Sequence, residues 1–232
     1  MMTESLENNN KFTIKYYKEF LTLAKDQGYL FVTLRDFLKK GCPSKGHVVL
    51  RHDLDLKPQT MQKMLDVENE LGINSSIFVR ITGNAYNFLS YPVLHMIRKA
   101  ELDGHEIGLH TSCVEFGQIN KVDPLKILSL ECDLLSKFVN LEGIAPHRDL
   151  NYAYNSLPYI EKNWDEIQKL GVSYHAYQKQ IEDACVYVNE GFNPHLCWRK
   201  YAPEEVIPTG NSMCILTHNH WWYDVHPFEE WR

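Results

Sequence analysis

The chain has 232 residues, of which 44% are hydrophobic and 23% are charged, and its formal net charge is -6. This composition is typical of one soluble α/β domain, and the absence of a Lys/Arg cluster argues against a nucleic-acid or anionic-membrane partner. No apolar stretch reaches the roughly 18 residues of a membrane span. The six cysteines form no CxxC pair, so we expect reduced thiols. The oligomeric state stays unknown.

The first elements follow from helical spacing and from residues that begin or end helices. Residues 1–10 are polar and lack a signal-peptide pattern, so we expect a disordered N-terminus, a folded domain over 11–232 and a cytoplasmic protein. Apolar spacing predicts a helix over 11–27, and Thr33 is expected to cap a short helix ending at Lys39. After a strand over 47–52, a helix over 58–71 begins at a proline and ends before a glycine.

Helices and strands then alternate along the rest of the chain. We expect helices over 92–102, 124–138 and 158–170, and strands over 75–81, 105–110, 143–148, 172–177 and 213–218. This alternation, with six or seven strands, predicts a single-domain, distorted (β/α) barrel with its site at the carboxyl ends of the strands. The pattern leaves open whether residues 178–210 cover that site or decorate the barrel.

The most informative motif is Arg51-His52-Asp53-Leu54-Asp55, which ends the predicted strand over 47–52. Alternate residues of a strand share a face, so Arg51, Asp53 and Asp55 should point the same way. Two carboxylates on one face require a cation or a proton between them, which indicates a metal ion or acid–base chemistry. A capped turn into the next helix is the alternative, and Arg51 could form a structural salt bridge.

Histidines recur at the other predicted strand ends, at His110, His147, His175 and His218. In the segment GHEIGLH, His105 and His110 are five residues apart, so they lie on opposite faces of a strand and cannot form a zincin site. We expect His110 to face the site and His105 to make a structural hydrogen bond. After His218, the pair Trp221 and Trp222 could line a sugar site or form a hydrophobic plug.

These motifs together resemble the polysaccharide deacetylase superfamily, the NodB-type carbohydrate esterases of family 4, over roughly residues 45–222. The residues that carry the resemblance are RHDLD at 51–55, an "RHDVD"-type motif, and the segments 72–79, 104–110, 144–148 and 216–222. The resemblance implies a distorted (β/α)7 barrel with one divalent metal ion. We expect zinc, with nickel, cobalt, manganese and iron as alternatives.

The resemblance also implies a role for each site residue. Asp55 and His110 match two metal ligands, but Val114 stands where the family has the second histidine of HxxxH. His147 is the expected replacement, and Glu115 is the alternative. The remaining assignments are a base, Asp53; an acid, His218; an arginine that orients the base or holds an anion, Arg148; and the substrate contacts Arg51, Trp221 and Trp222.

The implied activity is metal-dependent removal of an acetyl or similar acyl group from an amino sugar. The expected partner is a small or activated sugar of surface-polysaccharide biosynthesis. Two alternatives remain open. The first is a non-catalytic carbohydrate-binding or scaffold barrel that has lost its metal chemistry, and the second is a metallohydrolase of another amide or of a phosphate ester.

Overall fold

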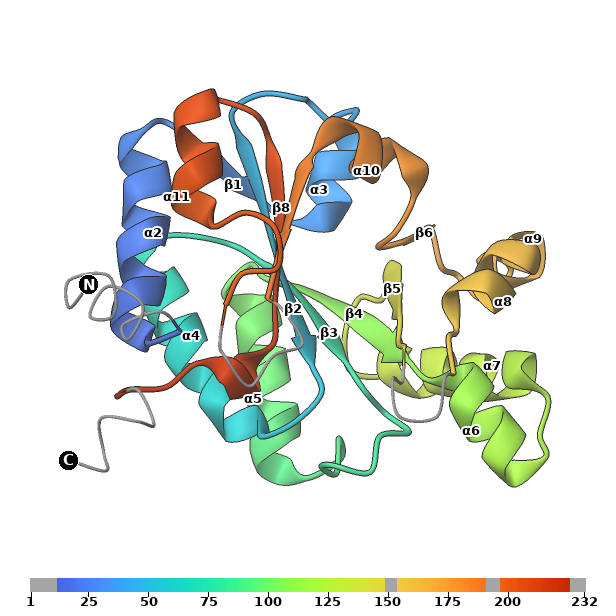
Figure 1. The fold of residues 1–232 in the computed structure, drawn as a ribbon. Helices are drawn as coiled ribbons and strands as arrows, with labels where there is room; N and C mark the ends of the chain where they lie inside the picture. Colours follow the sequence, from blue (N-terminus) through green and yellow to red (C-terminus); the bar gives the residue numbers. More distant parts are fainter. Residues whose placement is uncertain (1–11, 149–153, 191–196, 226–232) are drawn as a thin grey trace.

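The computed structural model describes residues 12–148, 154–190 and 197–225 (Figure 1). The predicted disordered segment 1–10 lies outside these residues. Eight parallel strands form one curved sheet in the described chain, in the order β6-β5-β4-β3-β2-β8-β7, with β1 paired beside β2. No pairing joins the outer strands β6 and β7 in this part of the chain, so the barrel is open. The predicted distorted (β/α) barrel is confirmed.

The strands follow the predicted apolar runs, with shifted ends. Their bounds are β1 Leu30–Val32, β2 His47–Leu54, β3 Ser76–Val79, β4 Glu106–Thr111, β5 Gly143–Pro146, β6 Tyr174–His175, β7 Val186–Asn189 and β8 Met213–Thr217. The predicted number of six or seven strands was too low. The strand over 172–177, which contains β6, was predicted, whereas β1 and β7 were not. β1 is too short to show an alternating pattern, and β7 lies in the less regular region 178–210, which offers only short strand candidates.

The helices cover both faces of the sheet. Their bounds are α2 Ile14–Asp26, α3 Leu34–Lys39, α4 Pro58–Leu71, α5 Tyr91–Leu102, α6 Cys113–Asn120, α7 Pro124–Ser136, α8 Leu157–Lys162, α9 Trp164–Gln168, α10 Lys179–Ala184 and α11 Pro203–Val206, with the 3-10 turns η1 Ile207–Thr209 and η2 Asn219–Trp221. Helix α4 has the predicted bounds, and α6 was not predicted. The predicted helix over 158–170 is divided at Asn163. No described helix has both the length and the apolar character of a membrane span.

Strand β2 shows how the alternating sequence divides the core into two. Val48, Leu50 and Leu54 belong to a large hydrophobic cluster that includes residues of α2, α4, α5 and α7. Val49 belongs to a smaller cluster that contains residues of α3 and α10. Arg51 lies on the same side of β2 as Val49, as the period of two requires. The barrel interior is therefore apolar at the start of β2 and charged towards its carboxyl end.

Gly108 of β4 allows an aromatic ring to lie close to this charged interior. A Cβ atom at Gly108 would lie 2.4 Å from the ring of Phe78. The Phe78 ring centroid in turn lies 5.4 Å from the Arg51 guanidinium carbon, and the Tyr177 ring lies 4.5 Å from it. The glycine thus makes room for one of the two rings that contact the buried arginine.

Candidate active site

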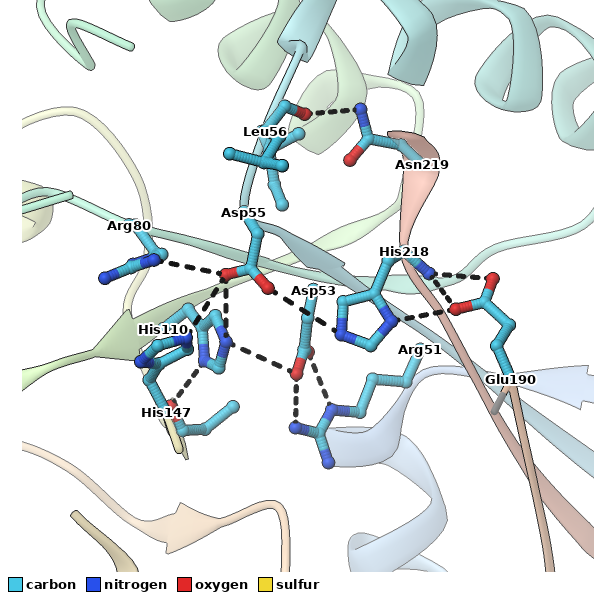
Figure 2. A network of polar contacts seen from close by, with 12 residues as sticks. Arg51, Asp53, Asp55, Leu56, Arg80, His110, His147, Glu190, His218 and Asn219 are labelled. Atoms are coloured by element: carbon cyan, nitrogen blue, oxygen red, sulfur yellow. Dashed lines mark hydrogen bonds and ion pairs between the residues drawn. The ribbon is translucent and has the colours of Figure 1, made fainter. Parts of the chain in front are cut away.

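The carboxyl ends of four strands bring five predicted site residues together (Figure 2). Asp53 lies near the end of β2 and Asp55 directly follows this strand; His110 belongs to β4, while His147 and His218 directly follow β5 and β8. Parallel strands end at the same edge of a sheet, which explains why residues so distant in sequence meet here. The sequence expectation that these side chains gather at one mouth agrees with the structure.

Asp55, His110 and His147 form a group that could hold a metal ion. Each offers one donor atom, and the three atoms all lie within 4.8 Å of one another. Asp55 Oδ1 is buried and makes no hydrogen bond, although His110 Nε2 lies 3.4 Å from it and His147 Nε2 4.0 Å from it. A buried carboxylate oxygen that faces two imidazole nitrogens fits a divalent cation, and the donor set suits zinc.

The ring of His110 is oriented for this role by the neighbouring strand. Its Nδ1 lies 2.8 Å from the carbonyl oxygen of Ala145 in β5. A carbonyl only accepts, so Nδ1 carries the hydrogen, and in the neutral ring the lone pair is then on Nε2, the nitrogen that faces Asp55. The same Nε2 atom lies 3.5 Å from Oδ2 of Asp53.

Asp53 is held by Arg51 from the same strand. Arg51 donates from Nε and Nη2 to the two carboxylate oxygens at 2.9 and 2.7 Å, and both side chains are almost fully buried. Burial by itself raises the pKa of Asp53, but the charge of Arg51 outweighs it and holds this pKa below its usual range. Arg51 therefore keeps Asp53 ionised and fixed in orientation.

Arg148, by contrast, is exposed, and its backbone pairs with Asn155. The structure gives the partnership with Asp53 to Arg51, for which a structural salt bridge was the alternative expectation. The structure therefore gives no support to a role of Arg148 in orienting Asp53, and its other expected role, holding a substrate anion, stays a prediction. An arginine two residues away on the same strand face reaches the carboxylate without crossing the mouth of the barrel.

His218 is paired with Glu190, a residue that the sequence did not indicate. Glu190 accepts from the backbone N–H of His218 and lies 2.8 Å from its Nδ1 atom. Burial lowers the pKa of His218, but the hydrogen bond and charge of Glu190 outweigh it and raise this pKa to about 9. His218 Nε2 lies 3.8 Å from Oδ2 of Asp55. A protonated imidazole therefore lies on the other side of Asp55.

Arg80 is a second site residue that was not predicted from the sequence. It directly follows β3, its side chain is 10% exposed, and its Nη1 lies 3.6 Å from Oδ1 of Asp55. Its Nη2 donates to Ser112 Oγ at 2.7 Å. Its position directly after β3 could have indicated it, because the rule that active sites lie at the carboxyl ends of parallel strands also identified His110 and His147.

One aromatic prediction and one histidine prediction need correction. Trp222 is 2% exposed, packs among the rings of Phe12 and Tyr17, and donates from its indole N–H to Glu190. It forms the alternative hydrophobic plug and cannot line a sugar site. His175 packs against Trp164 rather than joining the site residues, because it lies on a two-residue strand whose inward side chain is Tyr174. Trp221 is half-buried beside His220, whose pKa burial lowers to about 4.

A buried polar network lies on the opposite face of β2. Glu68 of α4 accepts from Tyr17 at 2.6 Å and lies 2.9 Å from Nε2 of His52. His105 accepts from the backbone N–H of Ser75 at 3.1 Å, which confirms its predicted structural role. This network ties β2 to the outer helices and lies behind the site residues.

Comparison with known proteins supports the fold. No protein-family model and no curated protein sequence matches the chain. Among solved structures, the Streptococcus pyogenes deacetylase PplD in complex with acetate is similar, with a TM-score of 0.53 and 18% identity over 90% of this chain and 92% of that chain. The chitin deacetylase from the fungal pathogen Colletotrichum lindemuthianum aligns with a TM-score of 0.36 and 16% identity over 82% and 80% of the two chains. The first of these likenesses shows a shared fold.

Proposed function

We propose that the protein is a metal-dependent hydrolase that removes an acetyl or similar acyl group from an amino sugar. The observation that carries the proposal is the grouping of Asp55, His110 and His147 around one point, with the Asp53–Arg51 and His218–Glu190 pairs on either side. The structure with the shared fold is described as a deacetylase in complex with acetate, which supports an acyl substrate.

The three residues Asp55, His110 and His147 would hold the metal ion. When bound, the metal would act as a Lewis acid on the acyl carbonyl and would make water a stronger acid. Asp53 accepts a proton at Oδ2, which faces the candidate ligands and keeps lone pairs besides the one that Arg51 uses. Ionised Asp53 is the form that a base requires.

His218 supplies a proton to the departing amine. Its Nδ1 atom is engaged by Glu190, so Nε2 is the nitrogen that faces Asp55 and the reacting groups. An amide nitrogen is a poor leaving group, which makes a positioned proton donor necessary. Trp221, half-buried in the 3-10 turn η2 that follows β8, is the remaining candidate for an aromatic contact with a sugar ring.

The first test is the metal content of chelator-free, untagged protein by mass spectrometry, with Asp55→Ala beside it. We expect about one zinc, nickel, cobalt, manganese or iron ion per chain, lost in Asp55→Ala and retained in the exposed-surface control Asp66→Ala. Metal-free wild-type protein after incubation with zinc and cobalt would refute the proposal and favour a non-catalytic barrel.

The second test is product release from acylated amino sugars. We expect acetate from N-acetylated oligosaccharides or from nucleotide-linked N-acetylamino sugars, the latter being candidates in surface-polysaccharide biosynthesis. Asp53→Asn and His218→Ala should each lower kcat by about 10²- to 10⁴-fold while the metal is retained. Release of formate or phosphate in place of acetate would assign the site to another amide or to a phosphate ester.

A further inference from the structure

The imidazole of His147 lies between two carboxylates. Its Nε2 atom is 4.0 Å from Asp55 Oδ1, and its Nδ1 atom is 3.5 Å from Glu115 Oε2. Glu115 belongs to the first turn of α6 and directly follows Val114, which stands at the position of the missing histidine. The helix after β4 therefore still contributes to this site, through the residue next to that position.

The two nitrogens of His147 have different surroundings. Asp55 Oδ1 is approached more closely by His110 and by Arg80, at 3.4 and 3.6 Å, than by His147. Of the two carboxylates, Glu115 at 3.5 Å lies nearer to His147 than Asp55 at 4.0 Å. Because a carboxylate only accepts hydrogen bonds, Glu115 favours the tautomer with the hydrogen on Nδ1, which leaves the Nε2 lone pair facing the metal ligands.

His110 shows the same division between its two nitrogens. Its Nδ1 atom faces the carbonyl oxygen of Ala145, and its Nε2 atom faces Asp55. Metal-binding histidines commonly donate their second N–H to a carbonyl or a carboxylate, which fixes both tautomer and ring orientation. Glu115 faces Nδ1 of His147 as Ala145 faces Nδ1 of His110, although at an ion-pair distance of 3.5 Å where the His110 contact is a hydrogen bond of 2.8 Å.

Arg80 keeps Glu115 in this position. Its Nη2 atom lies 3.8 Å from Glu115 Oε2 and donates to Ser112, while Nη1 faces Asp55. One guanidinium therefore bridges the two carboxylates and reduces their repulsion. Within the described residues, the donor atoms that all lie within 4.8 Å of one another come from Asp55, His110 and His147, without Glu115.

We propose that Glu115 is a positioning residue that fixes the tautomer and orientation of His147 and is not itself a metal ligand. The inference rests on the proposed function, because it concerns the same metal centre. It explains how a histidine that directly follows β5 can act in place of the missing residue on α6: the helix supplies the carboxylate that faces Nδ1, and the neighbouring strand end supplies the ligand.

The tautomer of His147 can be measured by ¹⁵N NMR on metal-free protein at alkaline pH. We expect the Nδ1–H form in the wild type and in Glu115→Gln, whose amide oxygen can still accept. Glu115→Ala should give a mixture of tautomers, and the exposed, first-turn control Glu182→Ala should resemble the wild type. A wild-type His147 with its hydrogen on Nε2 would overturn the proposal, and this result needs no variant to fold.

Zinc affinity, measured by competition with a chromophoric chelator, gives an independent readout. Glu115→Ala should bind one metal ion about 10- to 100-fold more weakly, with Glu115→Gln close to the wild type. If both variants lose affinity equally and both alter the cobalt absorption spectrum, Glu115 is a ligand and the proposal is wrong. If wild-type protein binds no metal at all, the proposed function fails while the tautomer comparison still decides the role of Glu115.

Discussion

Replacing Arg51 by methionine should destabilise the protein strongly. Arg51 is 0% exposed, and its only carboxylate contact among the described residues is the bidentate pair with Asp53, which is 2% exposed. Methionine retains much of the packing against Phe78 and Tyr177 but leaves the Asp53 carboxylate buried without its cation. Removal of one partner of a buried ion pair typically costs about 3–5 kcal/mol. For a domain of this size, that loss lowers Tm by about 6–20 °C.

The double variant Arg51→Met/Asp53→Leu separates the ion pair from packing. Removing both charges eliminates the unpaired carboxylate, so the double variant should lose less stability than Arg51→Met alone. Urea unfolding of the wild type, both single variants and the double variant completes the cycle. The exposed Arg98→Met serves as a control and should change the free energy of unfolding by less than about 0.5 kcal/mol.

Two results would refute this reasoning about Arg51. The first is a loss below about 1 kcal/mol in Arg51→Met, which is the range of exposed ion pairs. The second is a double variant whose loss equals the sum of the single losses, which would mean that the two side chains do not interact energetically.

Three further changes test the frame around the site. Burial raises the pKa of Glu68, but the charge of His52 outweighs it and holds this pKa below its usual range. The ionised carboxylate therefore stabilises the protein above about pH 4.5, and this stabilisation is lost in acid. The difference in unfolding free energy between wild type and Glu68→Gln, measured in urea, should shrink below that pH. Gly108→Ala should displace Phe78 and cost about 1–3 kcal/mol, seen as a lower Tm. Trp222→Ala should cost about 3–5 kcal/mol of unfolding free energy, as expected for a buried ring. An unchanged stability in Gly108→Ala or Trp222→Ala would contradict the packing described for that residue. A stability difference between wild type and Glu68→Gln that stays the same in acid would contradict the role of Glu68.

The predictable part of the fold is the part encoded in local patterns. Pro58 and Gly72 bound α4 because proline suits a first helical turn and glycine adopts the left-handed cap conformation. The period of two along β2 is enough to predict that Arg51 and Asp53 share one face of the strand. The rule that parallel strands end at one edge then brings His110 to the same place.

What could not be predicted depends on contacts between distant segments. Glu190 lies in a stretch without periodic pattern, so nothing in the sequence indicates that it reaches His218. Trp222 is buried by Phe12 and by residues of α2, a packing that its position next to Trp221 cannot reveal. Arg148 follows a strand end, as His147 does, yet it is exposed. A position at a strand end therefore identifies candidate site residues. Side-chain packing then determines which of these candidates face the site and which face solvent.

The two proton-transfer candidates differ in their surroundings in a way that matches their proposed roles. Asp53 is paired with a cation, Arg51, and its pKa is lowered. His218 is paired with an anion, Glu190, and its pKa is raised to about 9. Near neutral pH one group is thus an ionised acceptor and the other a protonated donor, on either side of Asp55. Hydrolysis of an amide needs both forms at once, and environments that move two pKa values apart are how one site provides them.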